Sequence, residues 1–338
     1  MKKKRIILSY DYELFFGDRS GTVLKSIIEP TNKLMEVMEQ NGFRGNFFVD
    51  YLMFRELEKL SDERAAADLN LLKEQIRDMV RRGHRVELHL HPHWIDAKYN
   101  GDGTWDFSDF THYRLSSLDE GKIVDMFISG TNYLTALARE IVPDYKIVAF
   151  RAGGWAVQPF DKLKRGFIEA GIKIDSSTSF GLYSIKKGQE YNFCNMPDKN
   201  MYCFENDVCI EDYEGNFIEI PITSFHIPAF FYLCEMVKKR SRYFEHYSDG
   251  THVRKDAVGP QKKKVLKRIE EKFDNSIRGL INFSFISPTP IIHYIKRVRD
   301  NSIVCFIDHP KDVCPSTIDG INRIGGYCES INYIDLVK

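Results

Sequence analysis

Short apolar segments alternate with longer amphipathic segments along most of this 338-residue chain. Strands that are joined through helices pair in parallel, with right-handed crossovers between them. The alternation therefore predicts an α/β fold built on a parallel sheet. Short apolar runs predict strands at 5–10, 44–49, 86–91, 146–150, 172–174, 282–285 and 303–307. Helical periodicity predicts helices at 30–40, 56–82, 119–141, 159–170 and 288–299.

The alternation loosens between about residues 180 and 275. There, 207–212 and 216–222 flank Tyr213-Glu214-Gly215, which predicts a hairpin. Eleven lysines and arginines then fall within 238–268, which we interpret as a solvated helical face or loop. The alternative is a clamp for a phosphate or uronate of a substrate. Because no repeat or low-complexity linker divides the chain, we predict one domain over 1–338, with an insertion at about 180–275.

Composition narrows the class of protein. A hydrophobic content of 43% supports a sizeable core, and Lys plus Arg equal Asp plus Glu at 48 each, so charge does not indicate nucleic acid as a partner. Acidic residues interrupt the first apolar run, which predicts a strand rather than a signal peptide. No segment reaches the roughly 20 apolar residues of a transmembrane segment. Seven cysteines without a Cys-x-x-Cys pair favour reduced thiols, and we expect a cytoplasmic protein.

Four histidines fall within residues 83–94, which read Gly-His-Arg-Val-Glu-Leu-His-Leu-His-Pro-His-Trp. From Val86 onwards, apolar residues alternate with Glu87, His89 and His91, the pattern of a strand with two unlike faces, and Pro92 ends the strand. Several buried imidazoles on one face would compete for hydrogen-bond partners. The cluster therefore favours a metal or catalytic role over a half-exposed strand. Periodicity alone pairs His89 with His91.

Ionisable residues follow five of the predicted strands at their carboxyl ends. Ligands bind at that edge in parallel α/β folds, so the coincidence predicts a binding or catalytic site. Asp11 and Glu13 lie two apart on an extended chain and point the same way, while Tyr12 faces the opposite side. The residues at the five strand ends are Asp11 with Glu13, then His89 with His91 and His93, then Arg151, Asp175 and His309.

Together these residues resemble the ordered motifs of the polysaccharide deacetylases, the NodB-homology carbohydrate esterases. The resemblance covers residues 5 to about 175 and resumes near 303, leaving the basic stretch unexplained. It implies a deformed (β/α) barrel, usually of seven strands, and metal-dependent removal of acetyl groups from N-acetylated sugars. The matching segments are Asp11-x-Glu13, Arg44–Val49, Gly83-His84 with His89-x-x-x-His93, Arg151–Trp155, Asp175 and His309.

The resemblance also implies a role for individual residues. Glu13, His89 and His93 would bind a divalent metal, expected to be zinc, and would leave open positions for water and the amide carbonyl. Asp11 would be the general base. Arg151 would pair with Asp11 and keep it charged.

The remaining roles complete the implied site. His309 in its protonated form would donate to the departing amine, helped by a carboxylate such as Asp175. His91 is expected to support the site, with the alternative that it replaces His93 as a ligand. Trp94 or Trp155 is expected to form a wall on which the sugar stacks. Glu87 is expected behind the ligands, as a partner for an imidazole or for Arg151.

Two departures from the family pattern bear on activity. Tyr12 separates acids that are usually two adjacent aspartates, and the second acid is Glu13. The proline that usually follows the arginine of motif three is also missing, which predicts a different loop shape. The ordinary structural alternatives are a helix N-cap for Asp175, a strand-end ion pair for Arg151, a loop position for His309, core positions for Trp94 and Trp155, and a surface position for His84.

The sequence thus predicts a metal-dependent hydrolase that cleaves a linear C–N amide bond. Its expected substrate is an N-acetylated sugar or polysaccharide precursor, including one carried on a nucleotide or lipid phosphate. Two alternatives stay open. One is a metal-dependent amidohydrolase acting on a small non-sugar amide, and the other is a catalytically silent carbohydrate-binding protein of the same fold.

Overall fold

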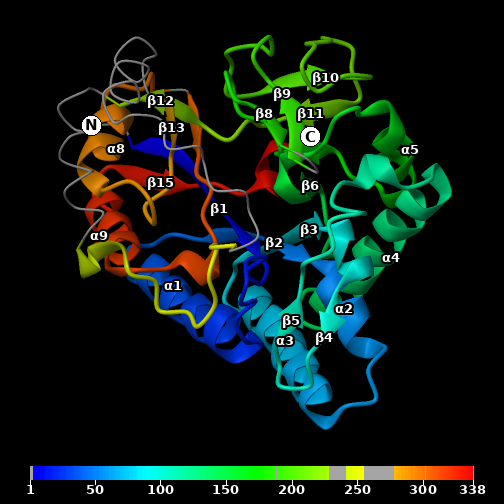
Figure 1. Cartoon of the computed structure of the whole chain (residues 1–338). Coiled ribbons are helices and arrows are strands. Elements are labelled where there is room, and N and C mark those ends of the chain that lie inside the picture. Colours follow the sequence, from blue (N-terminus) through cyan, green and yellow to red (C-terminus); the bar gives the residue numbers. More distant parts are fainter. Residues whose placement is uncertain (1–2, 187–188, 228–240, 255–277, 301, 338) are drawn as a thin grey trace, which may run out of the picture.

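Seven parallel strands form the main sheet of the protein (Figure 1). The computed structural model describes residues 3–186, 189–227, 241–254, 278–300 and 302–337. The parallel strands, in sheet order, are β11 (Phe217–Glu219), β7 (Ile174–Asp175), β6 (Ala149–Ala152), β3 (Arg85–Leu90), β2 (Gly45–Asp50), β1 (Lys4–Tyr12) and β14 (Ile303–Cys305). The sheet also carries antiparallel β10 (Tyr202–Phe204), which pairs with β11 at one end, and parallel β15 (Cys328–Ser330), which pairs with β1 and not with the end strand β14.

Backbone hydrogen bonds connect the two ends of the sheet. Thr223, just after β11, donates its N–H to the carbonyl of Cys305 in β14 at 2.9 Å. Ile281 donates to the carbonyl of Thr223 at 3.1 Å and accepts from the N–H of Ile307 at 3.1 Å. The sheet is therefore closed into a deformed (β/α) barrel through an irregular segment, which confirms the predicted fold class.

Two apolar cores follow from the two faces of the strands. Val86, Leu88 and Leu90 of β3 belong to the large core between the sheet and the surrounding helices. A smaller core fills the barrel interior and includes Ile7 and Phe48. Alternate residues of each strand face these two sides, so the polar face of β3 points into the barrel.

Amphipathic helices cover the outside of the sheet (Figure 1). The predicted helix at 56–82 is two helices, because Asp62 begins a new one by accepting the N–H of Ala65 at 2.8 Å. Asp119 begins α4 in the same way, accepting from Lys122 at 2.9 Å. The helices are α1 (Glu29–Gln40), α2 (Tyr51–Glu58), α3 (Glu63–Arg81), α4 (Glu120–Arg139), α5 (Asp161–Ala170), α8 (Pro288–Ile295) and α9 (Pro315–Ile324).

Short strand pairs lie outside the barrel. They are β4 (Lys98–Tyr99) with β5 (Trp105–Asp106), β8 (Tyr183–Lys186) with β9 (Gln189–Asn192), and β12 (Ser224–His226) with β13 (Arg278–Leu280). The six cysteines within the described ranges are free thiols. In those same ranges, no helix has the length and apolar character needed to cross a membrane.

Three local predictions were wrong. The hairpin arm before β11 is β10, whereas 207–212 is not a strand. Residues 282–285 form a turn, because the Asn282 side chain accepts the N–H groups of Ser284 and Phe285 at 2.7 and 3.0 Å. His84 is buried rather than at the surface. Much of the predicted basic stretch, at 228–240 and 255–277, lies outside the described residues.

The strand β11 lies within the range expected to be an insertion, yet it pairs with β7 in the main sheet. Residues 241–254 of the same range follow the barrel surface and contact other elements. Tyr243 donates its hydroxyl to Asp319 at 2.7 Å, and Tyr247 donates its N–H to the carbonyl of Val313 at 3.1 Å. We propose that the chain is a single domain with an insertion at about 180–275. Unlike in the sequence-based prediction, β11 within this range is counted as a strand of the barrel.

The buried His84 leads to a prediction about acid stability. Its Nδ1 accepts the N–H of Gly45 at 3.0 Å, and burial lowers its pKa to about 4. Between an unfolded pKa of about 6.5 and the folded value, only the unfolded chain is protonated, so stability falls as pH falls through this window. We expect the loss of unfolding free energy from pH 7 to pH 5 to be about 2 kcal/mol smaller in His84→Gln. Urea unfolding at both pH values measures it, and equal losses in the two proteins would contradict the assignment.

Candidate metal and catalytic site

The candidate site lies where four parallel strands end at one edge of the barrel. The strand register places Asp50 of β2 beside His89 of β3, and His89 beside Arg151 of β6. Asp11 in β1 donates its backbone N–H to the carbonyl of Asp308, just after β14, at 3.0 Å. The predicted convergence of polar residues at the carboxyl ends is therefore present in the structure.

A fully buried ion pair joins Arg151 to Asp11. Arg151 Nη1 lies 2.7 Å from Asp11 Oδ1. The other guanidinium donors also have acceptors, with Nε at 2.7 Å from the Ser176 carbonyl and Nη2 at 2.8 Å from Ser9 Oγ. The guanidinium plane lies over the ring of Phe48, 4.2 Å from its centroid. Because Arg151 occupies Oδ1, the oxygen of Asp11 that remains towards the site is Oδ2.

The two oxygens of Glu13 face different partners. Oε2 lies 3.0 Å from His89 Nε2 and 3.7 Å from His91 Nε2. Oε1 accepts from the ammonium group of Lys311 at 2.8 Å. Burial alone would raise the pKa of Glu13, but the charge of Lys311 and the hydrogen bond of His89 hold it well below its usual value. Glu13 is therefore a carboxylate in the folded protein.

His89 is oriented by the backbone of the neighbouring strand. Its Nδ1 donates to the carbonyl of Arg151 at 2.7 Å, which leaves Nε2 towards Glu13. Burial opposes a charge on His89, but Glu13 and the further negative charge of Asp11 outweigh it and raise the pKa of His89 to about 9. A ring fixed through Nδ1 presents Nε2 to a metal, as second-shell carbonyls commonly arrange.

The structure groups His91, and not the expected His93, with Glu13 and His89. One potential ligand atom from each of these three buried residues lies within 4.8 Å of the others. His91 continues the polar face of β3, whereas Pro92 starts a 3₁₀ helix (Pro92–Asp96) that carries His93 away from that face. The histidine grouped with His89 is therefore two residues after it, and not four residues after it as in the His-x-x-x-His spacing of the family.

His93 instead lies behind His91. The two Nδ1 atoms are 2.8 Å apart, so one ring donates to the other. Burial lowers the pKa of His93 to about 3 and that of His91 well below its usual value, so both rings are neutral. If His91 donates its Nδ1–H to His93, the lone pair of His91 Nε2 points to Glu13 and His89. Among the described residues, Nε2 of His93 has no hydrogen-bond partner although it is buried.

These donors fit a divalent metal. One carboxylate and two imidazoles are the ligands of catalytic zinc sites, which keep a further position open. Because a metal-bound imidazole nitrogen carries no proton, His89, whose pKa is raised to about 9, would release its Nε2 proton when the ion binds. Nε2 of His93 is also buried and has no hydrogen-bond partner in the described part of the chain. One more polar atom beside Glu13, His89 and His91 is thus available for a bound group. Lys311 is not expected in a catalytic zinc site. Its ammonium group already neutralises the charge of Glu13 through Oε1, the oxygen that does not face the histidines. Glu13, His89 and His91 would hold the ion.

His309 extends from the segment after β14 into the same site. Its Nε2 lies 3.8 Å from Asp11 Oδ2 and 3.7 Å from Glu13 Oε1. Its Nδ1 lies 3.2 Å from Asp312 Oδ2. Burial opposes protonation of His309, but Asp312 and then Asp11 outweigh burial and raise its pKa. His309 therefore favours the protonated form that an acid catalyst needs.

The carboxylate that lies beside His309 is Asp312, whereas Asp175, the expected helper, contacts other groups. Ser177 donates to Asp175 through its hydroxyl at 2.7 Å and its N–H at 3.0 Å. Across the β7–β11 pair, Asp175 lies opposite Glu219. Burial and the charge of Asp175 raise the pKa of Glu219 well above its usual value, so this pair shares a proton. The unforeseen pairing of β11 with β7 turns Asp175 towards Glu219.

Two further predicted residues, Glu87 and Trp94, have other surroundings than expected. Glu87 accepts the N–H groups of Val148 and Ala149 at 2.8 and 2.9 Å, and pairs with Arg85 rather than with an imidazole or Arg151. Trp94 is fully buried against Trp105 and Phe107, so it is core and not a sugar-stacking wall.

Trp155 remains accessible beside the site. It is half-buried and contacts Tyr191 edge to face, with ring centroids 5.9 Å apart. It follows Gly153, where a Cβ atom would lie 2.6 Å from His91 Cγ. Only glycine allows this backbone to approach His91 so closely, which explains the Gly-Gly sequence where the family usually has a proline nearby.

Asp50 and Lys311 are site residues that the sequence reasoning missed. Asp50 accepts from Trp94 Nε1 at 2.6 Å and from the N–H of His91 at 3.3 Å, and burial raises its pKa to about 7. It directly follows the predicted strand 44–49, so the rule applied to the other strand ends would have found it. Lys311 follows His309 by two residues, but a lysine in a loop gives no signal of burial.

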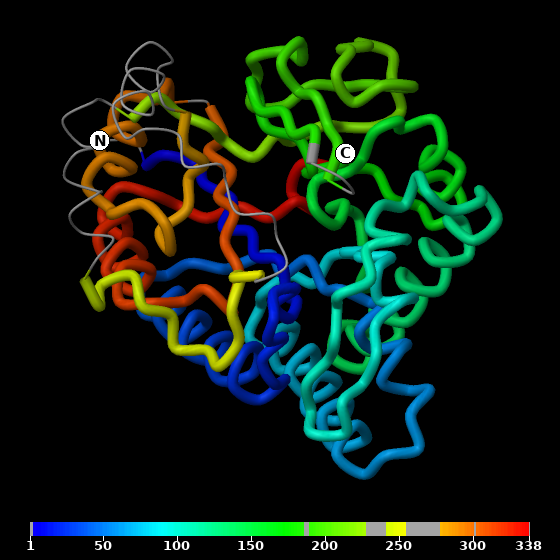
Figure 2. Tube along the Cα trace, viewed as in Figure 1, coloured from blue at the N-terminus to red at the C-terminus, as the bar shows by residue number. Residues whose placement is uncertain are grey.

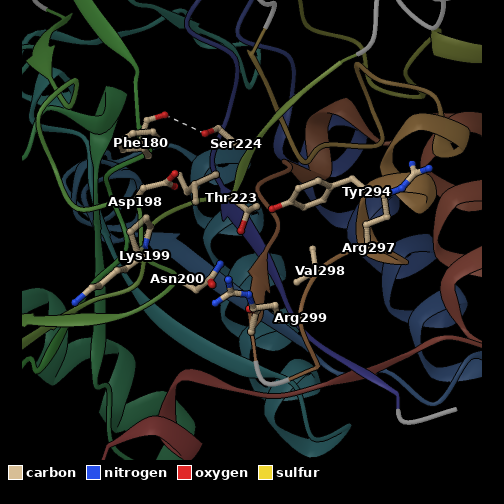
Figure 3. A pocket seen from close by; sticks show the side chains of 13 residues that line it. Phe180, Asp198, Lys199, Asn200, Thr223, Ser224, Tyr294, Arg297, Val298 and Arg299 are labelled. Carbon is tan, nitrogen blue, oxygen red and sulfur yellow. Dashed lines mark hydrogen bonds between the residues drawn. The ribbon is translucent and has the colours of Figure 1, made fainter.

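A separate cavity of about 440 Å³ lies between α8, the start of β12 and residues 198–200 (Figure 3). Ser224 Oγ donates to the carbonyl of Phe180 at 2.9 Å along its wall. None of its lining residues is one of the strand-end residues described above. It therefore has no part in the candidate site.

Comparisons with known proteins give fold neighbours only. No known family model and no curated protein sequence matches the chain. Among solved structures, a Mycobacterium smegmatis protein assigned as a polysaccharide deacetylase aligns at 11% identity and a TM-score of 0.46, over 99% of this chain and 88% of that one. The 4-alpha-glucanotransferase of Thermococcus litoralis aligns at 13% and 0.48, over 99% and 40%. A family 4 carbohydrate esterase of Streptomyces lividans aligns at 9% and 0.39, over 97% and 88%.

Since these three TM-scores are all below 0.5, the fold is assigned from the strand pairing and the site from its side chains. The strand order and the closure of the sheet are those of the deformed (β/α) barrel described above. The chemistry of the site follows from the distances among Asp11, Glu13, the histidines and Arg151.

The buried Arg151–Asp11 pair gives a stability prediction. Arg151→Met leaves the carboxylate of Asp11 buried without a cation, so we expect a loss of about 3–5 kcal/mol of unfolding free energy. Arg165→Met is the matched control, because Arg165 pairs with Glu169 at 2.7 Å on the surface of α5. The control should lose less than about 1 kcal/mol. Denaturant unfolding measures both, and similar small losses would contradict the role of the buried pair.

Proposed function

We propose that this protein is a metal-dependent deacetylase that removes the acetyl group from an N-acetylated sugar or polysaccharide precursor. One observation carries the proposal. A carboxylate paired with a buried arginine, a Glu-His-His group and a second, protonatable histidine meet at the same strand ends, with His309 Nε2 within 3.8 Å of both Asp11 and Glu13. Amide hydrolysis needs these three functions side by side.

The metal would be held by Glu13, His89 and His91, with zinc as the expected ion. When bound, it would supply Lewis-acid polarisation of the amide carbonyl and activation of a water molecule. The chain itself fixes the ligands. The Arg151 carbonyl orients His89, His93 orients His91, and Lys311 holds Oε1 of Glu13 so that Oε2 faces the histidines.

Asp11 and His309 would move the protons. Asp11 would accept the proton of the attacking water at Oδ2, because Arg151 binds Oδ1. The hydroxyl adds to the acyl carbon, the C–N bond breaks, and His309 gives its Nε2 proton to the departing nitrogen. The products are acetate and the free amine of the sugar.

The half-buried aromatic side chains near the site suit a sugar. Trp155 and Tyr191 contact each other, and Trp155 follows by two residues Gly153, whose backbone approaches His91. Aromatic faces pack well against the apolar face of a sugar ring. This supports a carbohydrate over a small non-sugar amide as the substrate, although both would use the same proton transfers. Comparing acetate release from N-acetylated sugars with release from simple acetamides separates the two.

A second candidate function is favoured by Lys311. Its ammonium group already compensates the charge of Glu13 at 2.8 Å, as a metal ion otherwise would. A protein stabilised in this way would bind a carbohydrate without hydrolysing it. Purified protein that holds no divalent metal and releases no acetate, yet is stabilised by an N-acetylated sugar, would support this candidate over the deacetylase.

The ligand assignment predicts unequal effects of two neighbouring histidines. His91→Ala should remove the bound divalent metal, while His93→Ala should weaken binding by about 10–100-fold through loss of orientation. Mass spectrometry measures the metal content of each variant after dialysis, and titration calorimetry measures its affinity for the metal. His112→Ala is the control, because His112 pairs with Asp96 away from the ligand group. Loss of metal in His93→Ala with retention in His91→Ala would restore the ligand set expected from the family.

The base assignment predicts a loss of turnover without a loss of metal. Asp11→Asn keeps the shape of the side chain but cannot take a proton, so acetate release from an N-acetylglucosamine oligomer should fall by about 10²–10⁴-fold. Asp161→Asn, at the exposed start of α5, is the control. Turnover in Asp11→Asn equal to that of the control would exclude Asp11 as the base.

A further inference from the structure

His252 lies outside every predicted motif, yet its ring is bound to the site through Asp312. His252 Nε2 lies 2.6 Å from Asp312 Oδ1, and Asp312 itself is almost fully buried. The other oxygen of the same carboxylate, Oδ2, lies 3.2 Å from Nδ1 of His309. The His252 side chain is 47% exposed, so the chain of contacts runs from solvent to the proposed acid.

The position of His252 is built by the fold. Thr251 donates its N–H to the carbonyl of Arg19 at 3.0 Å, and Asp18 donates to the carbonyl of Val253 at 2.9 Å, so both neighbours of His252 are held by backbone hydrogen bonds. A Cβ atom at Gly17 would lie 1.9 Å from the Thr251 carbonyl oxygen. Glycine at 17 is therefore required for this approach. Figure 2 shows the segment around residue 250 running beside the chain that leaves β1.

The ring of His252 is also fixed by packing. Its centroid lies 4.8 Å from that of Phe15 in an edge-to-face contact. Phe15 belongs to the same loop as the ligand Glu13, so His252 connects the loop after β1 with the segment after β14. Both oxygens of Asp312 are buried. Oδ1 is hydrogen-bonded to His252, whereas Oδ2 and His309 Nδ1 make an ion-pair contact at 3.2 Å that lacks the alignment of a hydrogen bond in the described residues.

We propose that His252 is a positioning residue that holds Asp312 and, through it, directs Nε2 of His309 at Asp11 and the substrate nitrogen. Asp312 takes the supporting place that the family motif would give to Asp175, and His252 holds Asp312 from residues 241–254, to which the sequence assigned no function. The role in turnover rests on the proposed deacetylase function. The role in orienting His309 stands on the contacts alone.

Two variants of His252 separate its hydrogen bond from its packing. His252→Phe keeps an aromatic ring against Phe15 but removes the donor, whereas His252→Gln keeps a donor. His246→Phe is the matched control, because His246 also contacts Phe15, at 5.2 Å, but has no contact with Asp312. Thermal unfolding should give similar midpoints for the three variants.

The first measurement does not depend on activity. Imidazole ¹H–¹⁵N spectra of the full-length protein, with His309 assigned by His309→Gln, should show its Nδ1 proton shifted downfield by Asp312. In His252→Phe this resonance should move or broaden, while in His252→Gln and His246→Phe it should stay. An unchanged His309 resonance in His252→Phe would overturn the proposal, whether or not the protein has deacetylase activity.

The second measurement tests the consequence for turnover. With an N-acetylglucosamine oligomer as substrate, His252→Phe should lower kcat by on the order of tenfold and leave KM unchanged. The loss is smaller than the roughly 10²–10⁴-fold rate enhancement that a general acid contributes, because His309 itself is still present. His252→Gln should restore most of the loss. A wild-type protein that releases no acetate would refute the proposed function, and the spectra would still decide the role of His252. A rise in KM with unchanged kcat would overturn the positioning role.

Discussion

The buried ion pair between Arg151 and Asp11 is the constraint on which the site depends. A guanidinium and a carboxylate are stable inside a protein only if nearly all their hydrogen-bonding groups are satisfied. Arg151 meets this condition with Ser9 and Asp11 of β1, with Ser176 just after β7, and with Tyr333. The barrel must therefore close in one register for the pair to be tolerated, and that register brings Asp11, Glu13 and His89 together.

The charges around this pair explain why the histidines behave differently. His89 lies among Glu13, Asp11 and Asp50, and its pKa is raised, whereas His91 and His93 contact each other, and burial lowers the pKa of both. One imidazole is thus drawn towards a positive charge while its neighbours are kept neutral. Neutral imidazoles are the form that binds metal, and the anionic surroundings attract a cation.

Much of the fold could be predicted because each strand and helix of the barrel has its own local pattern. β1, β2, β3, the helix α1 and most of α3 were recognisable from apolar periodicity alone, whereas α2 was not recognised as a separate helix. The wrong assignments lie where side chains override such patterns. At residues 282–285, an asparagine side chain captures two backbone N–H groups and converts an apolar run into a turn. At His84, a tertiary contact with the N–H of Gly45 buries a residue that looked solvent-exposed.

The candidate site was predictable in its location and less so in its details. Polar residues at strand ends located it, but the choice between His91 and His93 depended on the exact start of a 3₁₀ helix. The partner of His309 depended on which distant segments pack together, and neither Asp312 nor His252 has a motif of its own. Contacts between residues 60 apart, such as that of His252 with Asp312, are set by the closed barrel rather than by local sequence.

Tyr333 has a consequence for how the protein is made. Its hydroxyl lies inside the barrel, 2.8 Å from Ser176 Oγ and 3.4 Å from Arg151 Nη2, and its ring contacts Phe48 edge to face. During synthesis the ribosome releases Asp11, His89 and Arg151 long before residue 333 emerges. The nascent chain can therefore form its first strands early, but the packing around the buried arginine is completed only after translation has passed Tyr333. The surroundings of Arg151 in the candidate site are thus completed by a residue that lies 182 positions later in the chain.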